Sequence, residues 1–493
     1  MKKAILSIIF VFSLLVIDCF AQDLPKTPAG TRAQEVVELL NGTSSYKVED
    51  YIKNQYAPGF RDAYPAASHK AIFHTTQTMF GKVKVVDITK STQNEINLVT
   101  KSETKEAWLN LVLQVEPDEP HRIVSMGLMP GARPSNSETE EEKTQTGPKE
   151  SGDKPQEHEE ALFLNLEELH DYLLKSTREN EFSGSILIAK DGDPIFQKAY
   201  GYASKIFKVP NTIDTKYNLG SINKIFTTVA VTQLMEEGKL SIDDPIGKYL
   251  DIFPQEVADK VTIRHLLNMR SGWGDYWGNE YYLCHKDRLR TLSDYMEFIK
   301  DIPLDFEPGA NFQHSNTGYE IAGAIIEEVS GLDYFDYIKK NIYDPSGMSN
   351  TDTYHRDDLV ENLAVGYTNM NPNDPDGKGY EWSNTYMLSP RGTPAGGGYS
   401  TTEDLLKFDK ALRNHRLLNS DYTQYLLSRF QGSPGDPFSP PQKTYRVVGG
   451  AAGVSAFLGM DFQSSYSIIV LSNYDFPVAM EVAEEIIKML GIE

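Results

Sequence analysis

Residues 217–226 read YNLGSINKIF and continue through the stretch 227–237 to Gly238. Apolar side chains at positions 225, 229, 234 and 235 follow the period of a buried helix, and glycine is typical just past a helix end. We therefore expect Ser221 at or just before the N-terminus of this helix. Lys224 then lies one turn further along, on the same face.

The Ser-x-x-Lys spacing of this stretch suits nucleophilic catalysis. A serine hydroxyl is a weak nucleophile until a neighbouring base accepts its proton. The ordinary pKa of lysine is about 10.4, so Lys224 needs burial or a neighbouring charge to lower its pKa before it can be that base. Backbone N–H groups at the helix start could stabilise an oxyanion at the same place. A motif this short also occurs by chance, so the case for a catalytic Ser221–Lys224 pair depends on the motifs that surround it.

Several further motifs surround this one in the sequence. They are FQHSNTGY at 312–319 before an apolar helix at 321–329, PAGGGYSTTEDL at 394–405, GGAAGVS at 449–455, TIRHLL at 262–267 with Ser271-Gly272, and LSIDDP at 240–245. With these motifs, residues 184–473 resemble the serine β-lactamase-like, penicillin-binding superfamily, in particular its class C β-lactamases, family VIII esterases and D-aminopeptidases. The resemblance implies an α+β, β-lactamase/transpeptidase-like domain with an antiparallel sheet and a mainly helical insertion.

The resemblance assigns roles to individual residues. The Ser-x-x-Lys of the family falls on Ser221 and Lys224, its Tyr-x-Asn on residues 314–316, and its Lys-Thr-Gly or His-x-Gly on residues 447–449. It implies that Ser221 attacks a carbonyl while Lys224 and His314 share proton transfer, that Asn316 orients Lys224 or the substrate amide, and that the N–H groups of Ser221 and Gly450 form an oxyanion hole. Water then releases the acyl group, and neither a cofactor nor a metal is required.

Two positions depart from the family pattern. His314 replaces the usual tyrosine; an imidazole can serve as general base and acid near neutral pH, or it can simply be hydrogen-bonded in place. Val447 stands where a lysine or histidine usually meets the carboxylate of a substrate. Arg446 is a doubtful substitute because neighbouring strand residues point to opposite faces. Recognition of β-lactams or D-Ala-D-Ala peptides is therefore in question.

Composition divides the chain into four segments. Residues 1–21 have two lysines, about 14 apolar residues and Cys19-Phe20-Ala21, which is the layout of a cleavable signal peptide with Gln22 as the first mature residue. Asp18 disfavours a lipoprotein anchor on Cys19, and the apolar run is shorter than the roughly 20 residues of a membrane span. We expect a small α+β domain at 22–134, a flexible acidic linker at 135–160 and the hydrolase domain at 161–493.

The segment 22–134 shows helical patterns at 33–40, 48–55 and 69–80, followed by strand patterns at 82–88, 95–100, 107–115 and 121–129. Its last strand, in the stretch 121–127, resembles that of nuclear-transport-factor-like domains. The interpretation we favour is an accessory domain for packing or partner binding, without chemistry of its own. In the segment 161–493, a hairpin is expected at 185–199, strands at 454–461 and 466–472, and a closing helix at 478–490. Strands at both ends suggest a sheet completed by the two termini of the domain.

Charge and residue usage exclude several functions. A formal net charge of −22 disfavours nucleic acid as a partner. The sequence has no Gly-x-Ser-x-Gly and no His-Glu-x-x-His, which disfavours an α/β-hydrolase and a zinc site. Cys284 would be the single cysteine after signal cleavage, and we expect a small buried apolar residue more than a nucleophile. The aromatic residues between Trp273 and Tyr282 could wall a substrate cleft or be core.

Two functional hypotheses remain. The first is an exported serine hydrolase, periplasmic or secreted and without a stable membrane anchor, that forms a covalent acyl-enzyme with a small ester, an amide or a D-amino acid peptide. The second is a non-catalytic periplasmic binding or sensory protein on a degenerate hydrolase scaffold, favoured by His314 and Val447. In both, the ligand is a small molecule or a short peptide. The sequence does not identify a partner for the N-terminal domain.

Overall fold

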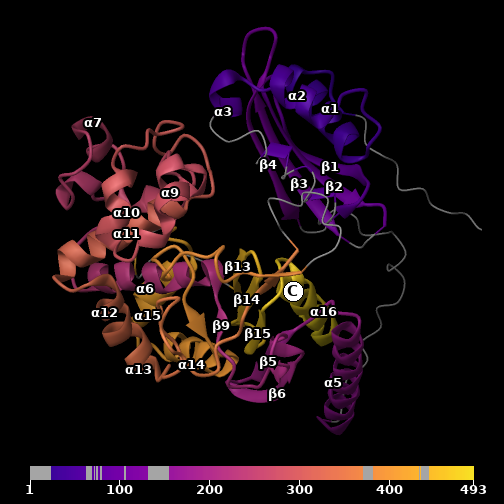
Figure 1. The fold of residues 1–493 in the computed structure, drawn as a ribbon, viewed down its shortest axis with the longest axis vertical. Coiled ribbons are helices and arrows are strands. Elements are labelled where there is room, and N and C mark those ends of the chain that lie inside the picture. The colour runs from indigo at the N-terminus through magenta and orange to yellow at the C-terminus, as the bar shows by residue number, and fades with distance from the viewer. Residues whose placement is uncertain are drawn as a thin grey trace, which may run out of the picture. The chain divides into compact units, whose positions relative to one another are not determined.

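The computed structural model describes residues 24–492, apart from 63–68, 71–72, 74–75, 78–79, 105–106, 132–154, 370–380, 432–433 and 435–442. The chain divides into two compact units, Met1–Glu150 and Ser151–Glu493 (Figure 1). The expected signal peptide at 1–21 lies outside the described residues. Among the described residues, no helix has both the length and the apolar character that crossing a membrane requires.

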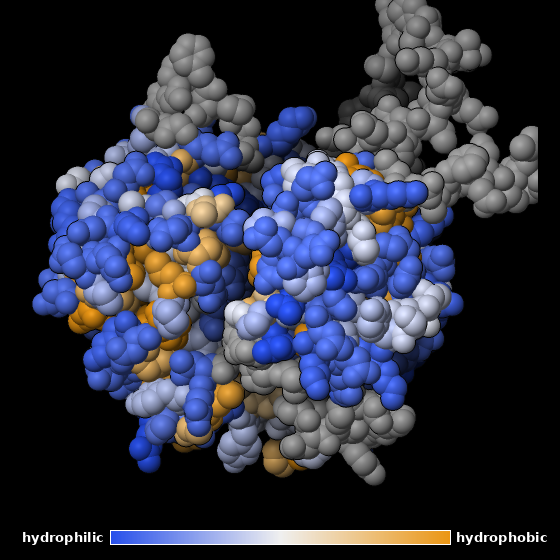
Figure 2. All heavy atoms as spheres, turned by 90° about the horizontal axis from the view of Figure 1, so that it is seen from above, coloured by the Kyte–Doolittle hydropathy of each residue, from blue (hydrophilic) through white to orange (hydrophobic). Residues whose placement is uncertain are grey.

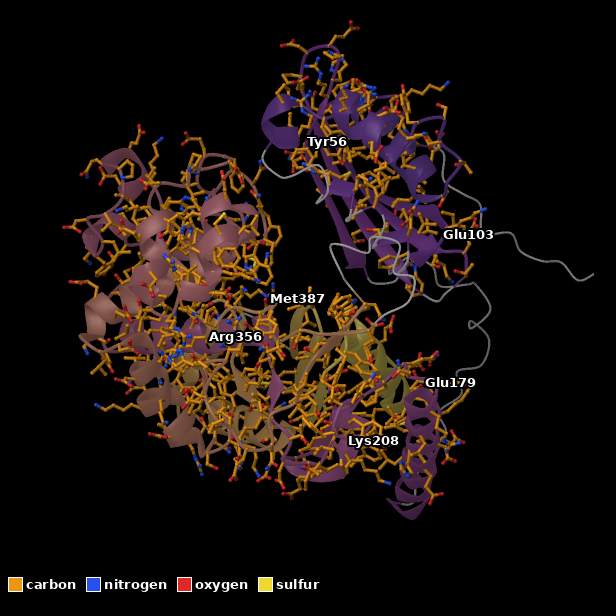
Figure 3. All side chains as sticks on the ribbon, in the orientation of Figure 1. Tyr56, Glu103, Glu179, Lys208, Arg356 and Met387 are labelled. Carbon is orange, nitrogen blue, oxygen red and sulfur yellow. The ribbon has the colours of Figure 1, made fainter. Side chains whose placement is uncertain are left out.

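The first unit packs helices against an antiparallel sheet. Its elements are α1 (Pro28–Leu40), α2 (Val48–Gln55), α3 (Pro58–Asp62), β1 (Val83–Ser91), β2 (Glu95–Ser102), β3 (Trp108–Val115) and β4 (Ile123–Gly131). The strands pair in sequence order, as expected for a meander. Alternate residues of β3, such as Leu109, Leu111 and Leu113, are buried against the helices. Tyr56, labelled in Figure 3, is buried in the same core.

Most helices and strands expected in this unit are confirmed, with small shifts at their ends. Helix α1 begins at Pro28, five residues before the expected start at Ala33, because the Thr27 side chain accepts a hydrogen bond from Gly30 N and proline fits the first turn. The described residues between His69 and Phe80 are helical.

The second unit is built on a five-stranded antiparallel sheet in the order β13-β14-β15-β5-β6. The strands are β5 (Gly184–Lys190), β6 (Asp193–Tyr200), β13 (Thr444–Ala451), β14 (Val454–Asp461) and β15 (Tyr466–Ser472). Strand β5 from the start of the unit pairs with β15 from its end, from Tyr466 opposite Lys190 to Ser472 opposite Gly184. The expected sheet completed by both termini, and with it the α+β fold class, is confirmed.

Helices cover both faces of this sheet. On one face, α5 (Pro155–Arg178) and α16 (Val478–Leu490) share a core with Ile186 and Ile188. Leu187 and Ala189, the alternate residues of β5, face the larger core that contains the helical insertion. Helix α5 begins at Pro155, inside the segment 135–160 that we expected to be a linker, because proline and then glutamates, alanine and leucine favour helix there. Residues 132–154 of that expected linker are not among the described residues.

The insertion between β6 and β13 is mainly helical, as expected. Its helices and helical turns are η1 (Gly220–Ile222), α6 (Asn223–Glu236), η2 (Ile246–Lys248), α7 (Gln255–Ala258), α8 (Ile263–Leu267), η3 (Tyr276–Gly278), α9 (Glu280–His285), η4 (Lys286–Arg288), α10 (Leu292–Ile299), α11 (Asn316–Ser330), α12 (Tyr334–Ile338), η5 (Lys339–Tyr343), α13 (Asp344–Ser346), α14 (Thr402–Arg413) and α15 (Ser420–Leu427). Its short strands are β7 (Tyr202–Ser204), β8 (Val209–Pro210), β9 (Tyr217–Asn218), β10 (Tyr367–Thr368), β11 (Trp382–Ser383) and β12 (Tyr399–Ser400). Helix α6 is buried along nearly its whole length at the centre of this region (Figure 1).

Hydrophilic residues cover most of the described surface on the face drawn in Figure 2, and hydrophobic residues form small patches between them. Large exposed hydrophobic side chains include Phe207, Phe312 and Tyr386.

Candidate active site

Ser221 lies in the helical turn η1, directly before α6. Gly220 has a φ of +49°, which glycine adopts at little cost, and its N–H donates a 2.9 Å hydrogen bond to Oδ1 of Asn218. Leu219 N donates a 2.7 Å hydrogen bond to the carbonyl oxygen of Gly398. These bonds fix the backbone on the N-terminal side of Ser221. The expected position of Ser221 at the helix start is therefore confirmed.

Lys224 is one helical turn further on, and its amine contacts Ser221. The Nζ atom lies 3.0 Å from Ser221 Oγ, 2.6 Å from Asn316 Oδ1 and 2.6 Å from the carbonyl oxygen of Ala395. The last two atoms can only accept hydrogen bonds, so they take two N–H groups of the amine. When the amine is neutral, its lone pair is left for the third direction, toward the hydroxyl of Ser221. The geometry therefore suits transfer of the serine proton to Lys224.

Burial makes this proton transfer accessible near neutral pH. The side chain of Lys224 is buried, and loss of hydration lowers its pKa to about 8. The negative charges of Asp275 and Glu320 act in the opposite direction and limit the shift. The nitrogen also lies 5.3 Å from the centre of the Tyr319 ring. A substantial fraction of Lys224 is thus neutral at mildly alkaline pH.

Asn316 reaches Lys224 because it begins helix α11. Ser315 caps this helix: its Oγ accepts a 2.9 Å hydrogen bond from Gly318 N and donates one of 3.2 Å to the carbonyl oxygen of Gly274. Asn316 N donates a 2.8 Å hydrogen bond to Oδ1 of Asp275. The loop at 274–275 therefore fixes the helix start that presents the Asn316 amide.

His314 contacts Asp275 instead of the serine–lysine pair. Its Nδ1 lies 2.8 Å from Oδ2 of Asp275, and 52% of its side chain is exposed. Among the described residues, no hydrogen bond joins His314 to Ser221 or Lys224. The structure thus brings together Ser221, Lys224 and Asn316 directly and holds His314 beside them through Asp275.

Strand β13 passes directly against the nucleophile turn. A Cβ atom on Gly449 would lie 1.9 Å from the carbonyl oxygen of Leu219 and 3.0 Å from Ser221 N. A Cβ atom on Gly220 would lie 2.8 Å from Gly450 N. The lack of side chains at Gly220 and Gly449 therefore lets the backbone of β13 approach the turn. This approach places the N–H groups of Gly450 and Ser221 in one small region.

Arg446 and Val447, which precede this contact on β13, point in opposite directions. Val447 packs against the core that contains α6. The positive charge of Arg446 instead acts on Glu484 of α16, on the opposite face of the sheet, where it partly offsets the burial that raises the pKa of this carboxyl. As expected from strand geometry, Arg446 does not take the position of the family's lysine.

Glu320 is a buried acid that was not singled out from the sequence. It lies one turn after Asn316 on α11, and its Oε1 accepts hydrogen bonds from Tyr276 (2.9 Å) and Thr393 (2.7 Å). Its Oε2 has no hydrogen-bond partner among the residues that the structure describes. Burial raises the pKa of this carboxyl to about 7, against the two hydrogen bonds and the charge of Lys224. A single charged residue directly before the uncharged run 321–326 was the signal in the sequence.

A loop far along the chain supplies the Ala395 carbonyl. It is fixed to the segment near Arg356, which donates from its backbone N–H to the carbonyl oxygen of Pro390 at 2.6 Å and from its guanidinium to that of Leu388 at 3.4 Å. Arg356 and the neighbouring Met387 are labelled in Figure 3. Because a backbone carbonyl leaves no mark in the sequence, this contact could not be predicted.

The structure divides the aromatic residues between Trp273 and Tyr282 into buried and exposed ones. Trp273, Tyr276 and Tyr282 are buried, so they belong to the core, whereas Trp277 and Tyr281 are exposed by 47% and 44%.

The expectation that Cys284 is buried is wrong. Cys284 is exposed because it lies on the solvent side of the short helix α9, whose buried contact is Tyr282.

Comparison with known proteins identifies the family. The family model described as Beta-lactamase matches residues 174–489. Penicillin-binding protein 4* of Bacillus subtilis (strain 168) is 29% identical over 340 residues, which cover 64% of this chain and 71% of that protein. A penicillin-binding protein structure from Bacillus halodurans is 31% identical, covers 64% of this chain and 98% of that one, and has a TM-score of 0.56.

More distant structures share the fold. The octameric penicillin-binding protein homologue from Pyrococcus abyssi is 26% identical, covers 66% of this chain and 78% of that one, and has a TM-score of 0.55. A class C β-lactamase, the hydrolase EstCE1 and a D-amino acid amidase from Ochrobactrum anthropi SV3 align with TM-scores of 0.53 to 0.54 at 20% to 23% identity. The match over residues 174–489, together with the Ser221–Lys224 geometry, shows that this chain belongs to the beta-lactamase family of penicillin-binding-protein-like serine hydrolases.

Proposed function

We propose that this chain is an exported hydrolase that forms a covalent acyl-enzyme on Ser221 and acts on a small ester, an amide or a D-amino acid peptide. One observation carries the proposal: two acceptors occupy the N–H groups of Lys224 and leave its third direction to Ser221 Oγ, 3.0 Å away. Burying a charged lysine costs free energy of desolvation. Both of these acceptors are neutral, so neither forms an ion pair with Lys224 that would offset this cost.

The chemistry proceeds in two halves. Ser221 Oγ attacks the carbonyl carbon while its proton passes to Nζ of Lys224. The N–H groups of Ser221 and Gly450 stabilise the oxyanion, a contribution worth about 100- to 1,000-fold per donor in related chemistry. The proton then passes to the leaving group as its bond to the carbonyl carbon breaks. Water attacks the acyl-enzyme, and Ser221 Oγ regains a proton when the acid is released.

The preferred substrate class follows from the lack of a cationic side chain at position 447 of β13. Val447 gives the substrate a neutral side chain where the family offers a cation, and Arg446 faces away. A substrate carboxylate would gain no ion pair at position 447. Neutral esters and amides are therefore the preferred acyl donors, ahead of β-lactams and peptides that end in D-Ala-D-Ala.

Covalent capture tests the proposal. The purified protein is exposed to a fluorophosphonate, p-nitrophenyl acetate, a D-amino acid amide and benzylpenicillin, and its intact mass is measured. We expect a reagent that reacts to add one group per protein molecule. This adduct should be lost in Ser221→Ala and kept in the control variant Ser420→Ala, which changes an exposed serine of α15. His314→Ala should lose far more turnover than His314→Tyr.

A specific observation supports the second candidate, a non-catalytic binding or sensory protein on the same scaffold. Val447 removes a cation that the family uses, and His314 has no direct bond to the serine–lysine pair. Equal, residual turnover in wild type and Ser221→Ala, together with no adduct from any donor, would favour that candidate.

Export has its own test, because it depends on residues 1–21. We expect the protein expressed with its own N-terminus in a bacterial host to be recovered outside the cytoplasm, with Gln22 as its first residue. A cytoplasmic product that retains Met1 would contradict export without affecting the hydrolase assignment.

A further inference from the structure

Asp275 bridges two residues of the active-site segment. Its Oδ2 lies 2.8 Å from Nδ1 of His314, and its Oδ1 accepts a 2.8 Å hydrogen bond from Asn316 N. The residue between them, Ser315, bonds to the carbonyl oxygen of Gly274. Three consecutive residues are thus each tied to the loop at 274–275.

The carboxylate selects one tautomer of the imidazole. An ionised carboxylate only accepts hydrogen bonds, so Nδ1 of His314 must carry the hydrogen that points at Asp275. In the neutral ring Nε2 is then an acceptor with a free lone pair. Within the described part of the chain, Nε2 has no hydrogen-bond partner, and 52% of the His314 side chain is exposed.

A series of contacts joins His314 to the serine–lysine pair. Ser315 is extended, with φ −144° and ψ 110°. Asp275 contacts both His314 and the backbone N–H of Asn316, and Oδ1 of Asn316 lies 2.6 Å from Nζ of Lys224. Lys224 is buried against Ser221, whereas His314 is half exposed, so the two bases differ in their access to water.

We infer that Asp275 is a positioning residue that holds His314 as the base for the deacylation step. This inference rests on the proposed function. In this step Nε2 of His314 removes a proton from water as the water oxygen bonds to the acyl carbon. The bond between that carbon and Ser221 Oγ then breaks, and the proton passes from Nε2 to Oγ. Asp275 stabilises the imidazolium that exists between the two transfers.

The variant Asp275→Asn isolates this role. Its side-chain oxygen can still accept from Asn316 N, but its amide N–H₂ faces Nδ1 of His314 and must donate to it. The hydrogen of the imidazole then moves to Nε2, which can no longer accept a proton from water. With p-nitrophenyl acetate we expect kcat to fall about 100-fold and KM to fall with it, because only deacylation is slowed. A burst of nitrophenolate and an acetyl adduct on Ser221 should accumulate.

Two further measurements exclude a merely structural effect. In a His314→Tyr background, Asp275→Asn should change kcat by less than about threefold, since no imidazole remains to be oriented. In protein labelled with ¹⁵N-histidine, the signal of His314 is assigned as the one that is lost in His314→Tyr. In wild type this signal should report the Nδ1–H tautomer, and in Asp275→Asn the Nε2–H tautomer. A general loss of structure would produce neither result.

The outcomes separate this inference from the proposed function. If Ser221 takes no acyl group from any donor, the proposed function fails. If Ser221 is acylated and Asp275→Asn releases the acetyl group at the wild-type rate, the role of Asp275 alone is overturned. It is also overturned if the variant lowers kcat and kcat/KM equally with no adduct, or lowers kcat equally in the His314→Tyr background.

Discussion

Nζ of Lys224 lies 2.6 Å from Oδ1 of Asn316, a neutral acceptor at a place where a carboxylate would fit equally well. A neutral partner holds the amine without raising its pKa by a full charge. This choice lets burial dominate and brings the pKa of Lys224 to about 8.

The activity should therefore rise with pH through about 8. Only the neutral amine can accept the Ser221 proton, and its fraction increases as the pH passes the pKa of Lys224, which burial lowers to about 8. The measurement is kcat/KM for a p-nitrophenyl ester between pH 6 and 10, corrected for spontaneous hydrolysis. A profile that is flat across this range would contradict a titrating base.

Asn316→Asp should move that rise to higher pH. The added carboxylate stabilises the ammonium form, and a shift of one pH unit lowers the neutral fraction about tenfold at pH 7. The same pH series measures it, with Asn54→Asp on the exposed face of α2 as a control for added charge. An unchanged midpoint in Asn316→Asp would show that Lys224 is not the group that limits the rate.

Glu320→Gln should remove part of the pH dependence of stability. Burial raises the pKa of Glu320 from 4.5 to about 7, so the folded state keeps a proton that the unfolded chain has already released. The folded state therefore loses stability as the pH rises from about 4.5 to about 7, by on the order of 3 kcal/mol for this group. Urea unfolding at pH 5, 6 and 7 should give a flatter curve for Glu320→Gln than for wild type. Parallel curves would mean that the carboxyl titrates normally.

Val447→Lys should open the site to carboxylates. A charge-assisted hydrogen bond contributes about 1.5–3 kcal/mol, or roughly 10- to 100-fold in rate if it forms in the transition state. We expect acylation by benzylpenicillin, followed by intact mass, to accelerate while ester hydrolysis changes little. Val448→Lys is the matched control because this neighbour is 39% exposed and leaves the strand in the opposite direction. Equal gains in both variants would indicate a general charge effect.

Gly449→Ala should displace β13 from the nucleophile turn. The added methyl group would lie 1.9 Å from the carbonyl oxygen of Leu219, so the backbone must move. We expect the free energy of unfolding to fall by about 1–3 kcal/mol and labelling of Ser221 to slow at least about tenfold. Val448→Ala, on the same strand, should leave labelling near the wild-type rate. Full labelling of Gly449→Ala would show that the close approach is dispensable.

Local patterns predicted the regular elements well. The spacing of apolar residues placed the strands at 454–461 and 466–472 and the helix at 478–490 at the bounds that the structure has. Ser-x-x-Lys put Ser221 and Lys224 on one side of a helix start because four residues make about one turn. These features depend on a few neighbouring residues, and so they can be read from a short stretch.

Contacts between distant segments were harder to predict. His314 and Asn316 came from a family resemblance, and neither Asp275 nor Glu320 was singled out. Asp275 follows the Ser271-Gly272 motif, yet nothing in its own neighbourhood shows that it meets residues 314–316. Cys284 was misjudged because its exposure depends on how α9 sits on the core, which a lone cysteine does not reveal.

The sheet order sets when the enzyme can become reactive. Ser221 and Lys224 are made long before β13, β14 and β15, and β5 has no partner on its β15 side until the final strand exists. A ribosome-bound chain that stops short of residue 449 therefore contains Ser221 and Lys224 but lacks the β13 backbone at Gly449 and Gly450 that packs against the nucleophile turn. We therefore expect a chain that lacks β13 to be unreactive toward acyl donors.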